Sequence, residues 1–255
     1  MEEIEYYSSM KTLFILLIIS SYLEAIITIT PMEIGKKPGW SGTIKGALQT
    51  KRGNTDKDEY SLGVKVQYDN NSSYLIFTDV IGVYGEASGE RNTNKTYFHT
   101  RYIHKFYENL DYELFIQSET NEFTSVEKRR LGGGGLRYHY LHSDYGDIFI
   151  GLGAYWESIT YTTQIDPDER NSRLNSYVAY VKDFSKDIKF TYVGYYQPRV
   201  DKLKDYITSS AIEFKMKIHK EFSLKIIVYY DVDSTPAIGR ETTDFTQLTA
   251  FSYEF

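Results

Sequence analysis

Apolar and polar residues alternate singly along most of the chain from Trp40 onward. Successive side chains of a β-strand point to opposite faces, so each alternating stretch predicts a strand with one apolar and one polar face. Clusters of turn-forming residues, such as residues 69–72, separate these stretches. The pattern predicts about twelve strands. They are residues 40–49, 60–68, 74–84, 98–107, 111–118, 131–141, 148–156, 174–184, 188–196, 206–219, 222–232 and 242–255.

The predicted linkers alternate in length. Those after even-numbered strands are tight, as at Lys220-Glu221, whereas those after odd-numbered strands are long and polar, as at residues 86–95 and 162–173. Short turns at one end and longer loops at the other are typical of outer-membrane barrels with both termini on one side. Strands of about ten residues also suit a tilted crossing of the hydrocarbon layer. We therefore predict an all-β fold, a transmembrane antiparallel up-and-down β-barrel, over residues 40–255.

The final strand places aromatic residues on one parity and mostly small or polar residues on the other. Its end, with Phe251, Tyr253 and Phe255, resembles the closing strand of bacterial outer-membrane barrels, whose terminal aromatic residue is read by the assembly machinery. This resemblance implies that the three residues form an assembly signal. The partners we expect are that machinery, outer-membrane lipid and lipopolysaccharide.

The first 25 residues predict a secretory signal peptide. Lys11 is followed by the apolar run at residues 13–19 and by small residues, an arrangement typical of such peptides. Met10 is a better translation start for this peptide than Met1, because residues 2, 3 and 5 are acidic and oppose the positive charge expected before the apolar run. Residues 26–39 then predict a periplasmic lead-in, and the protein is expected in the outer membrane of a Gram-negative bacterium. The alternative is an uncleaved anchor helix that reaches Ile29.

Composition narrows the possible classes. The chain has 255 residues, 41% of them hydrophobic, and its mean hydropathy of -0.44 is too low for a bundle of membrane helices. Barrel strands avoid that test, because half of their residues face a polar lumen. The 25 Tyr residues suit both strands and membrane interfaces. A net charge of -6 without a basic block argues against nucleic acid, and the absence of Cys excludes disulfides.

Several short motifs carry a family resemblance. They are Trp40-Ser41-Gly42, Gly46, Gly53-Asn54-Thr55 and the closing Tyr253-x-Phe255. With these motifs the chain resembles, over about residues 40–255, the family of salt-induced outer-membrane proteins, a domain of unknown function. The resemblance implies a bacterial outer-membrane β-barrel with a link to salt or osmotic stress. It implies no catalytic residues.

Candidate chemistry along the chain is weak. His142-Ser143 lies at a predicted periplasmic turn, and nothing in the sequence brings an orienting partner to it, as nucleophilic catalysis requires. Gly132 to Gly135 lies within a strand pattern, so it indicates room for bulky neighbours or a kink rather than a phosphate loop. Residues 166–169 are interpreted as an exposed acidic loop. We therefore expect no catalytic residue, no metal site and no cofactor.

The polar parity of the strands predicts the groups that line the lumen. These groups could neutralise one another as a nonconducting plug, or they could line a narrow pore that favours anionic solutes. The function we expect is a small passive channel or an envelope-maintenance protein. The alternatives are a lipid-modifying outer-membrane enzyme and a soluble periplasmic β-sandwich binding protein. The predicted lumen-lining residues are Lys45, Lys65, Arg101, Lys105, Glu113, Arg137, Glu213, Lys215, Lys217 and Lys225.

Overall fold

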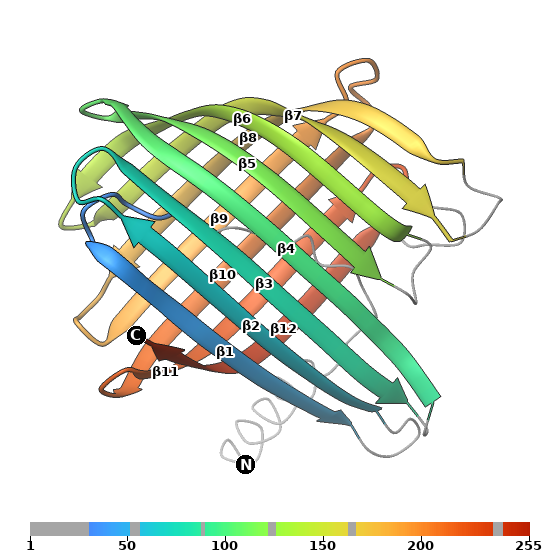
Figure 1. Cartoon of the computed structure of the whole chain (residues 1–255), viewed down its shortest axis with the longest axis horizontal. Coiled ribbons are helices and arrows are strands. Elements are labelled where there is room, and N and C mark those ends of the chain that lie inside the picture. The colour runs from blue at the N-terminus through green and yellow to red at the C-terminus, as the bar shows by residue number, and fades with distance from the viewer. Residues whose placement is uncertain (1–30, 52–56, 88–89, 122–125, 163–166, 237–241) are drawn as a thin grey trace, which may run out of the picture.

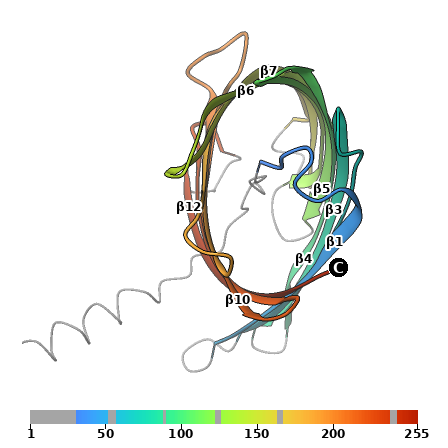
Figure 2. The same ribbon diagram turned by 90° about the vertical axis from the view of Figure 1, so that its left-hand side faces the viewer.

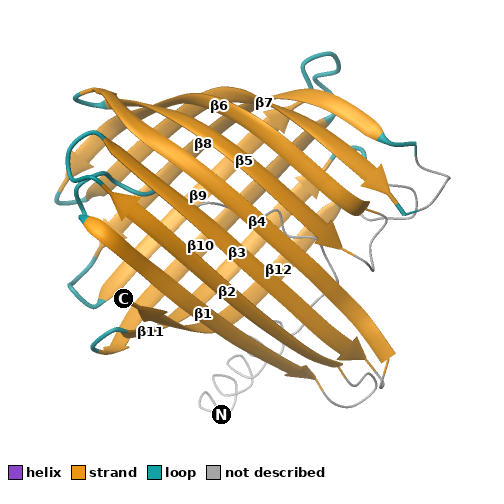
Figure 3. Ribbon diagram, viewed as in Figure 1, coloured by secondary structure: helices purple, strands orange, loops and turns teal. Residues whose placement is uncertain are grey.

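A computed structural model describes residues 31–51, 57–87, 90–121, 126–162, 167–236 and 242–255. The predicted signal peptide, residues 1–25, lies outside the described residues. Within them the chain forms twelve strands, drawn as arrows in Figures 1 and 3. The strands are β1 (Gly39–Lys51), β2 (Lys57–Asp69), β3 (Tyr74–Ala87), β4 (Glu90–Tyr107), β5 (Leu110–Asn121), β6 (Val126–Ser143), β7 (Gly146–Tyr161), β8 (Glu169–Asp183), β9 (Ile188–Pro198), β10 (Tyr206–His219), β11 (Phe222–Asp233) and β12 (Thr243–Glu254).

The strands close into a barrel. Each one pairs antiparallel with its neighbours in sequence, and β12 returns to pair with β1. Figure 2 shows the closed, flattened outline from one end. The prediction of an all-β antiparallel barrel is confirmed, and the sandwich alternative is wrong, because a single continuous sheet surrounds the interior. Among the described residues there is no helix with the length and apolar character that a membrane crossing needs.

The barrel wall is apolar outside and polar inside. Outward side chains such as Leu62 and Leu152 are 60% and 66% exposed, whereas the inward Arg137 and Glu157 are 2% and 0% exposed. In water, this arrangement would expose a continuous apolar surface and bury charges. In a bilayer, the apolar band faces lipid and the ladder of a closed sheet leaves no free edge. The alternation in the sequence therefore specifies which face is in contact with lipid.

A row of aromatic rings follows one rim of the apolar band. The ring centroids of Trp40 and Tyr68 are 5.2 Å apart, those of Tyr68 and Tyr74 are 6.1 Å apart, and those of Tyr74 and Tyr102 are 5.8 Å apart. Amphipathic rings of this kind collect at membrane interfaces. The row therefore indicates where the apolar band ends on this side of the barrel.

The two ends of the barrel differ. The turns at residues 70–73, 108–109, 144–145, 184–187 and 220–221 lie at the same end as the start of β1 and the C-terminus. We call this end the tight-turn end, and the other the long-loop end. One predicted long loop is wrong. Residues 86–95 are mostly strand, because β3 and β4 continue to pair as far as Ala87 and Glu90.

Residues 31–38, here called the lead-in segment, lie inside the tight-turn end of the barrel (Figure 2). Met32 and Ile34 pack against the buried cluster of Leu75, Phe77 and Ile103. The sequence predicted a lead-in but not this position. Polar contacts hold the segment as well: Arg137 Nη1 donates to the Met32 carbonyl at 2.8 Å, and the Gly35 amide donates to Asp69 Oδ2 at 2.7 Å.

The seam between β1 and β12 is the shortest ladder in the barrel. Residues 43–46 pair with residues 251–254, whereas β1 pairs with β2 along its whole length. At the end of the chain, the Gly42 amide donates to the Phe255 carbonyl at 2.8 Å, and the Phe255 amide donates back at 3.0 Å. Closure of the barrel therefore depends on the last five residues of the chain.

Candidate functional site

One wall of the lumen, from β4 to β9, carries a buried network of ion pairs. Arg101 Nη1 lies 3.4 Å from Glu113 Oε2, and Arg137 Nη2 lies 2.6 Å from Asp111 Oδ2. Tyr177 of β8 donates to the same Glu113 oxygen at 2.9 Å. These contacts join β4, β5, β6 and β8, so they brace the inside of the curved sheet. We call this wall the dry wall.

A second network of the dry wall lies toward the long-loop end. Arg129 Nη2 and Arg173 Nε each lie 2.6 Å from a different oxygen of Glu157. Arg173 Nη2 also pairs with Asp205 Oδ1 at 3.0 Å. One carboxylate therefore serves two arginines, and the set connects three strands with the linker between β9 and β10.

Arg199 extends this network to the surface. Its Nη1 lies 3.2 Å from Asp205 Oδ2, and its Nη2 lies 2.7 Å from Asp201 Oδ2. The hydrogen bond from Arg199 lowers the pKa of the exposed Asp201 carboxyl below its ordinary value. This pair lies in the linker outside the strands, where the carboxylate stays in contact with water.

Side chains of the dry wall surround a small internal space. A cavity of about 40 Å³ lies between β4 and β9, with room for a few water molecules. Arg101 from β4 and Tyr195 from β9 both line this cavity, although four strands lie between β4 and β9 in the sheet. Side chains from β4 and β9 therefore approach each other across this side of the lumen. The cavity is lined by His99, Arg101, Phe115, Gln117, Arg129, Leu131, Tyr155, Asn175, Tyr195 and Gln197.

On the opposite wall, from β10 through β12 and β1 to β3, several inward charged groups are partly exposed, although Asp69 and Asp231 are buried. We call this opposite wall the wet wall. The side chains of Lys65 and Asp79 are 26% and 18% exposed and lie 3.5 Å apart. Those of Lys225 and Glu213 are 16% and 20% exposed and lie 3.0 Å apart. Lys215 pairs with Glu254 of the closing strand. These inward groups are accessible to water and their charges are largely compensated.

The ten predicted lumen residues thus fall into three groups. Arg101, Glu113 and Arg137 lie in the dry wall. Lys105 and Lys217 are exposed close to the tight turns, and each lies next to a register shift. The remaining five are half-buried in the wet wall: Lys45, Lys65, Glu213, Lys215 and Lys225.

Three residues of the dry wall were absent from the predicted set. Arg129, Glu157 and Arg173 each lie one or two residues beyond the predicted limit of their strand. They share the inward parity of those strands. Extending each alternating pattern by one or two positions would have identified them. At these strand ends, however, the outward residues are also polar, so the sequence no longer distinguishes the two faces.

The residues of the predicted assembly signal point away from the lumen. Phe251, Tyr253 and Phe255 are 62%, 38% and 56% exposed. The Tyr253 ring packs against Phe222 with centroids 5.0 Å apart. The three rings therefore form an accessible stripe along the end of β12, beside the seam.

The histidines considered for catalysis have other surroundings. His99 is buried in the dry wall, with Nδ1 3.3 Å from Gln117 Oε1. The Ser143 hydroxyl donates to the Gly146 carbonyl at 3.3 Å rather than to the His142 ring. His142 itself faces Asp147. The pairing of a Ser with a His that the enzyme alternative requires is therefore not formed at this turn.

Comparison with known proteins identifies the family. The family described as "Protein of unknown function, DUF481" matches residues 44–255, and the chain belongs to this family. The resemblance proposed from the Trp40 and Gly46 motifs is thereby confirmed as to family. None of the functionally curated proteins matches the sequence.

Solved structures show the same architecture at low sequence identity. An outer-membrane channel from Pseudomonas putida F1 superposes with a TM-score of 0.53 at 7% identity, covering 89% of this chain and 97% of that one. The translocator domain of the autotransporter NalP from Neisseria meningitidis gives 0.49 at 7% identity, covering 86% and 90%. The KdgM porin gives 0.47 at 12% identity, covering 84% and 99%. The first likeness shows that the fold is that of an outer-membrane β-barrel.

Proposed function

We propose that this member of the DUF481 family is a narrow passive channel of the bacterial outer membrane, without catalytic activity. In this proposal residues 1–25 are a signal peptide and the tight-turn end faces the periplasm. The stripe of Phe251, Tyr253 and Phe255 is presented to the assembly machinery, and lipid and lipopolysaccharide surround the apolar band. The conducting path follows the wet wall.

The observation that carries this proposal is the difference between the two walls. The dry wall is filled by ion pairs and aromatic rings around a cavity of about 40 Å³. On the wet wall, Lys65, Asp79, Glu213 and Lys225 keep part of their inward surface accessible. A barrel with a purely structural role does not require one wall to be more accessible to water than the other. A channel requires a hydrated side along which solutes pass.

The charges of the wet wall suggest weak selectivity. Lys65, Lys215 and Lys225 each have a carboxylate partner, so the field along the path is largely cancelled. Of the two interpretations of the lumen, an anion-favouring pore needs an excess of unpaired cations, which these pairs do not provide. We therefore expect passage of small ions of both signs.

Envelope maintenance without transport is the second candidate, because the lead-in segment lies inside one mouth. Met32 and Ile34 are packed against the wall there, and Lys37 reaches Glu254 at 2.8 Å. A lumen closed in this way supports a structural role, including one in salt or osmotic stress. The two candidates differ in whether the purified barrel conducts.

The experiment uses the absence of Cys from the chain. Lys65→Cys places a single thiol on the wet wall, and Val64→Cys places one on the lipid side of the same strand. Each purified barrel is inserted into a planar bilayer and treated with a bulky, charged thiol reagent. We expect single-channel current in both variants and a block by the reagent only in Lys65→Cys.

The outcomes separate the two candidates. If the wild-type barrel carries no current at any voltage, the channel proposal is wrong and the structural role remains. Current that the reagent fails to block in Lys65→Cys, although labelling is complete by mass spectrometry, contradicts a path along the wet wall. A block in Val64→Cys equal to that in Lys65→Cys would contradict it as well.

A further inference from the structure

Strand β6 carries a β-bulge near the tight turn to β7, and this bulge changes which side chains face the lumen. His139 pairs with Phe149 and Leu141 pairs with Ile148, so Tyr140 is the extra residue. In a regular strand, residues 139 and 142 would point to opposite faces. The bulge moves His142 onto the face of His139, opposite Asp147. Bulges of this kind commonly re-aim a side chain beside a functional site.

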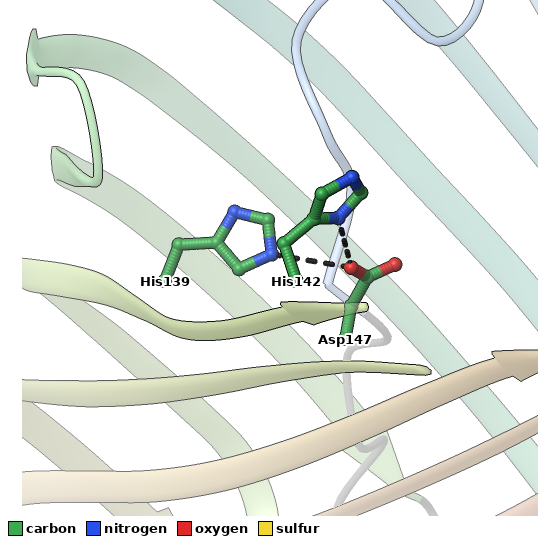
Figure 4. A group of neighbouring side chains, drawn as sticks. All are labelled: His139, His142 and Asp147. Atoms are coloured by element: carbon green, nitrogen blue, oxygen red, sulfur yellow. Dashed lines mark hydrogen bonds and ion pairs between the residues drawn. The ribbon is translucent and has the colours of Figure 1, made fainter. Parts of the chain in front are cut away.

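As a result, three potential metal ligands converge at the tight-turn end. His142 Nδ1 is hydrogen-bonded to Asp147 Oδ1, and His139 Nε2 lies 3.5 Å from the same oxygen. One ligand atom from each of the three residues can be chosen so that all lie within 4.8 Å of one another. Figure 4 shows the three side chains directed toward a common point beside the pale blue lead-in segment.

The cluster has one polar atom that the protein leaves unsatisfied. His139 Nε2 is buried from solvent and has no hydrogen-bond partner in the structure. Its ring is held by stacking on Phe149, with centroids 4.3 Å apart. A buried ring nitrogen without a partner is costly unless another group binds it. His142, by contrast, is 72% exposed, so an ion can reach the cluster from water.

The donor set indicates the class of ion. Two imidazole nitrogens and one carboxylate suit Zn²⁺, Ni²⁺ or Cu²⁺, whereas Mg²⁺ and Ca²⁺ prefer oxygen ligands only. Tetrahedral Zn²⁺ places its ligand atoms roughly 3.4 Å apart when each bond is about 2.0–2.2 Å. The three ligand atoms here lie within 4.8 Å of one another, so they would move closer together around an ion. Three protein ligands leave a fourth position for water.

A neighbouring cation competes for the same carboxylate. Lys36 Nζ lies 4.0 Å from Asp147 Oδ2 and 3.1 Å from Glu33 Oε1. An ion at the cluster would repel this ammonium group. The site is therefore connected electrostatically to the lead-in segment, which occupies the mouth of the lumen.

We infer that His139, His142 and Asp147 form a binding site for a divalent transition-metal ion at the tight-turn end of the barrel. The site does not depend on whether the lumen conducts. It uses side chains that the sequence alone did not bring together.

The test is calorimetric titration of the full-length, untagged barrel in detergent with Zn²⁺, because a histidine tag would bind the ion. The visible spectrum of added Co²⁺ reports a tetrahedral site. We expect one ion per barrel and no heat with Ca²⁺. His142→Ala and Asp147→Asn should each weaken binding at least about tenfold. Lys36→Gln should strengthen binding roughly two- to fivefold, because it removes a competing charge.

His219→Ala is the matched control, since His219 is exposed at the same end of the barrel but in another hairpin. It should bind Zn²⁺ like the wild type. Because His142 is exposed, its replacement leaves the barrel folded, and a mobility shift on boiling verifies this. Zn²⁺ binding unchanged in His142→Ala, or no binding by the wild type, overturns the inference. Weaker binding in Lys36→Gln contradicts the proposed position of the ion.

Discussion

At the scale of single residues, Glu157 shows how charges can be buried in this lumen. It is fully inaccessible to water, yet each of its oxygens receives an arginine, one from β6 and one from β8. A buried charge is tolerated only when it is paired and hydrogen-bonded. The carboxylate therefore stabilises Arg129 and Arg173 as much as they stabilise it.

Replacement of Glu157 by Gln should destabilise the folded barrel by about 3 kcal/mol, because two buried guanidinium groups lose their shared carboxylate. Urea unfolding in detergent, followed by tryptophan fluorescence, measures the loss. Glu108→Gln is the control, since this residue is exposed at a turn and should change the free energy of unfolding by less than about 0.5 kcal/mol. Equal stability of the two variants would contradict the ion-pair network.

The surface pair of Arg199 and Asp201 predicts a pH dependence. The hydrogen bond from Arg199 lowers the pKa of Asp201, so it stabilises the linker at pH values above the ordinary carboxyl pKa of about 3.9. That contribution is lost as the pH falls through the lower pKa of the folded state. A carboxyl NMR titration should give a midpoint for Asp201 below about 3.9.

Two variants test the cause of that shift. Arg199→Gln should return the Asp201 midpoint toward about 3.9. Lys202→Gln should move it much less, since Lys202 makes the smallest contribution to the lowered pKa. An unchanged midpoint in Arg199→Gln would show that the hydrogen bond is not the cause.

At the scale of elements, the strands were predicted correctly in number and order but not in length. Single alternation identifies a strand only where one face meets lipid and the other meets polar groups. Beyond the membrane both faces meet water, so the start of β4, with Arg91, Asn92 and Asn94, resembles a loop in sequence. Its ladder with β3 nevertheless continues. Backbone hydrogen bonds set the length of these strands, so the polarity of the side chains does not predict where the strands end.

The bulge in β6 shows why the metal-ligand cluster was not predicted. In sequence, His139 and His142 are three residues apart, which in a regular strand separates them onto opposite faces. Only the extra Tyr140 brings them together with Asp147. Nothing in the residue types around Tyr140 distinguishes a bulge from a regular strand. This part of the site could therefore be identified only from the backbone of the structure.

The glycine run in β6 gives a prediction at the same scale. A Cβ on Gly133 would lie 2.4 Å from the Ala154 carbonyl and 2.5 Å from Tyr155 Cβ, whereas one on Gly46 would meet nothing within 4 Å. The sequence pattern indicates room for bulky neighbours at this run. The atoms met at Gly133 instead belong to the main chain and the Cβ of β7, so this glycine permits a close approach of the two strands. Gly133→Ala should cost about 3 kcal/mol of stability, because the wall must shift. Gly46→Ala should be nearly neutral.

Heat-modifiability on gels compares the two glycine variants directly. The temperature at which the folded band disappears should fall clearly for Gly133→Ala and stay near the wild-type value for Gly46→Ala. If both variants behave like the wild type, β6 and β7 do not approach each other as closely as the structure has them.

At the scale of the whole molecule, we expect the short β1–β12 seam to limit stability, because only four residue pairs join the two strands. Lys45 and Ser252 are directly opposite each other across it. In antiparallel pairs the Cα atoms are about 4.5–5.5 Å apart, which permits a disulfide. Lys45→Cys combined with Ser252→Cys should therefore oxidise readily and link almost the whole chain into one loop. In the chain-entropy model this adds about 5 kcal/mol of stability.

The gain should appear as a higher temperature for loss of the folded band and should vanish on addition of a reductant. The two single-cysteine variants serve as controls. If the oxidised double variant melts like the reduced one, the seam is not where the barrel opens first.

The two walls also give the barrel uneven stiffness. Among the described residues, buried ion pairs brace the β4–β9 half, while the opposite half contains the short seam. Lateral tension in a swollen cell envelope would therefore be taken up by the compliant half, where the hydrated groups lie. In mechanical terms, we expect a stiff half-cylinder closed by a more compliant side, whose cross-section would change with tension in the surrounding membrane.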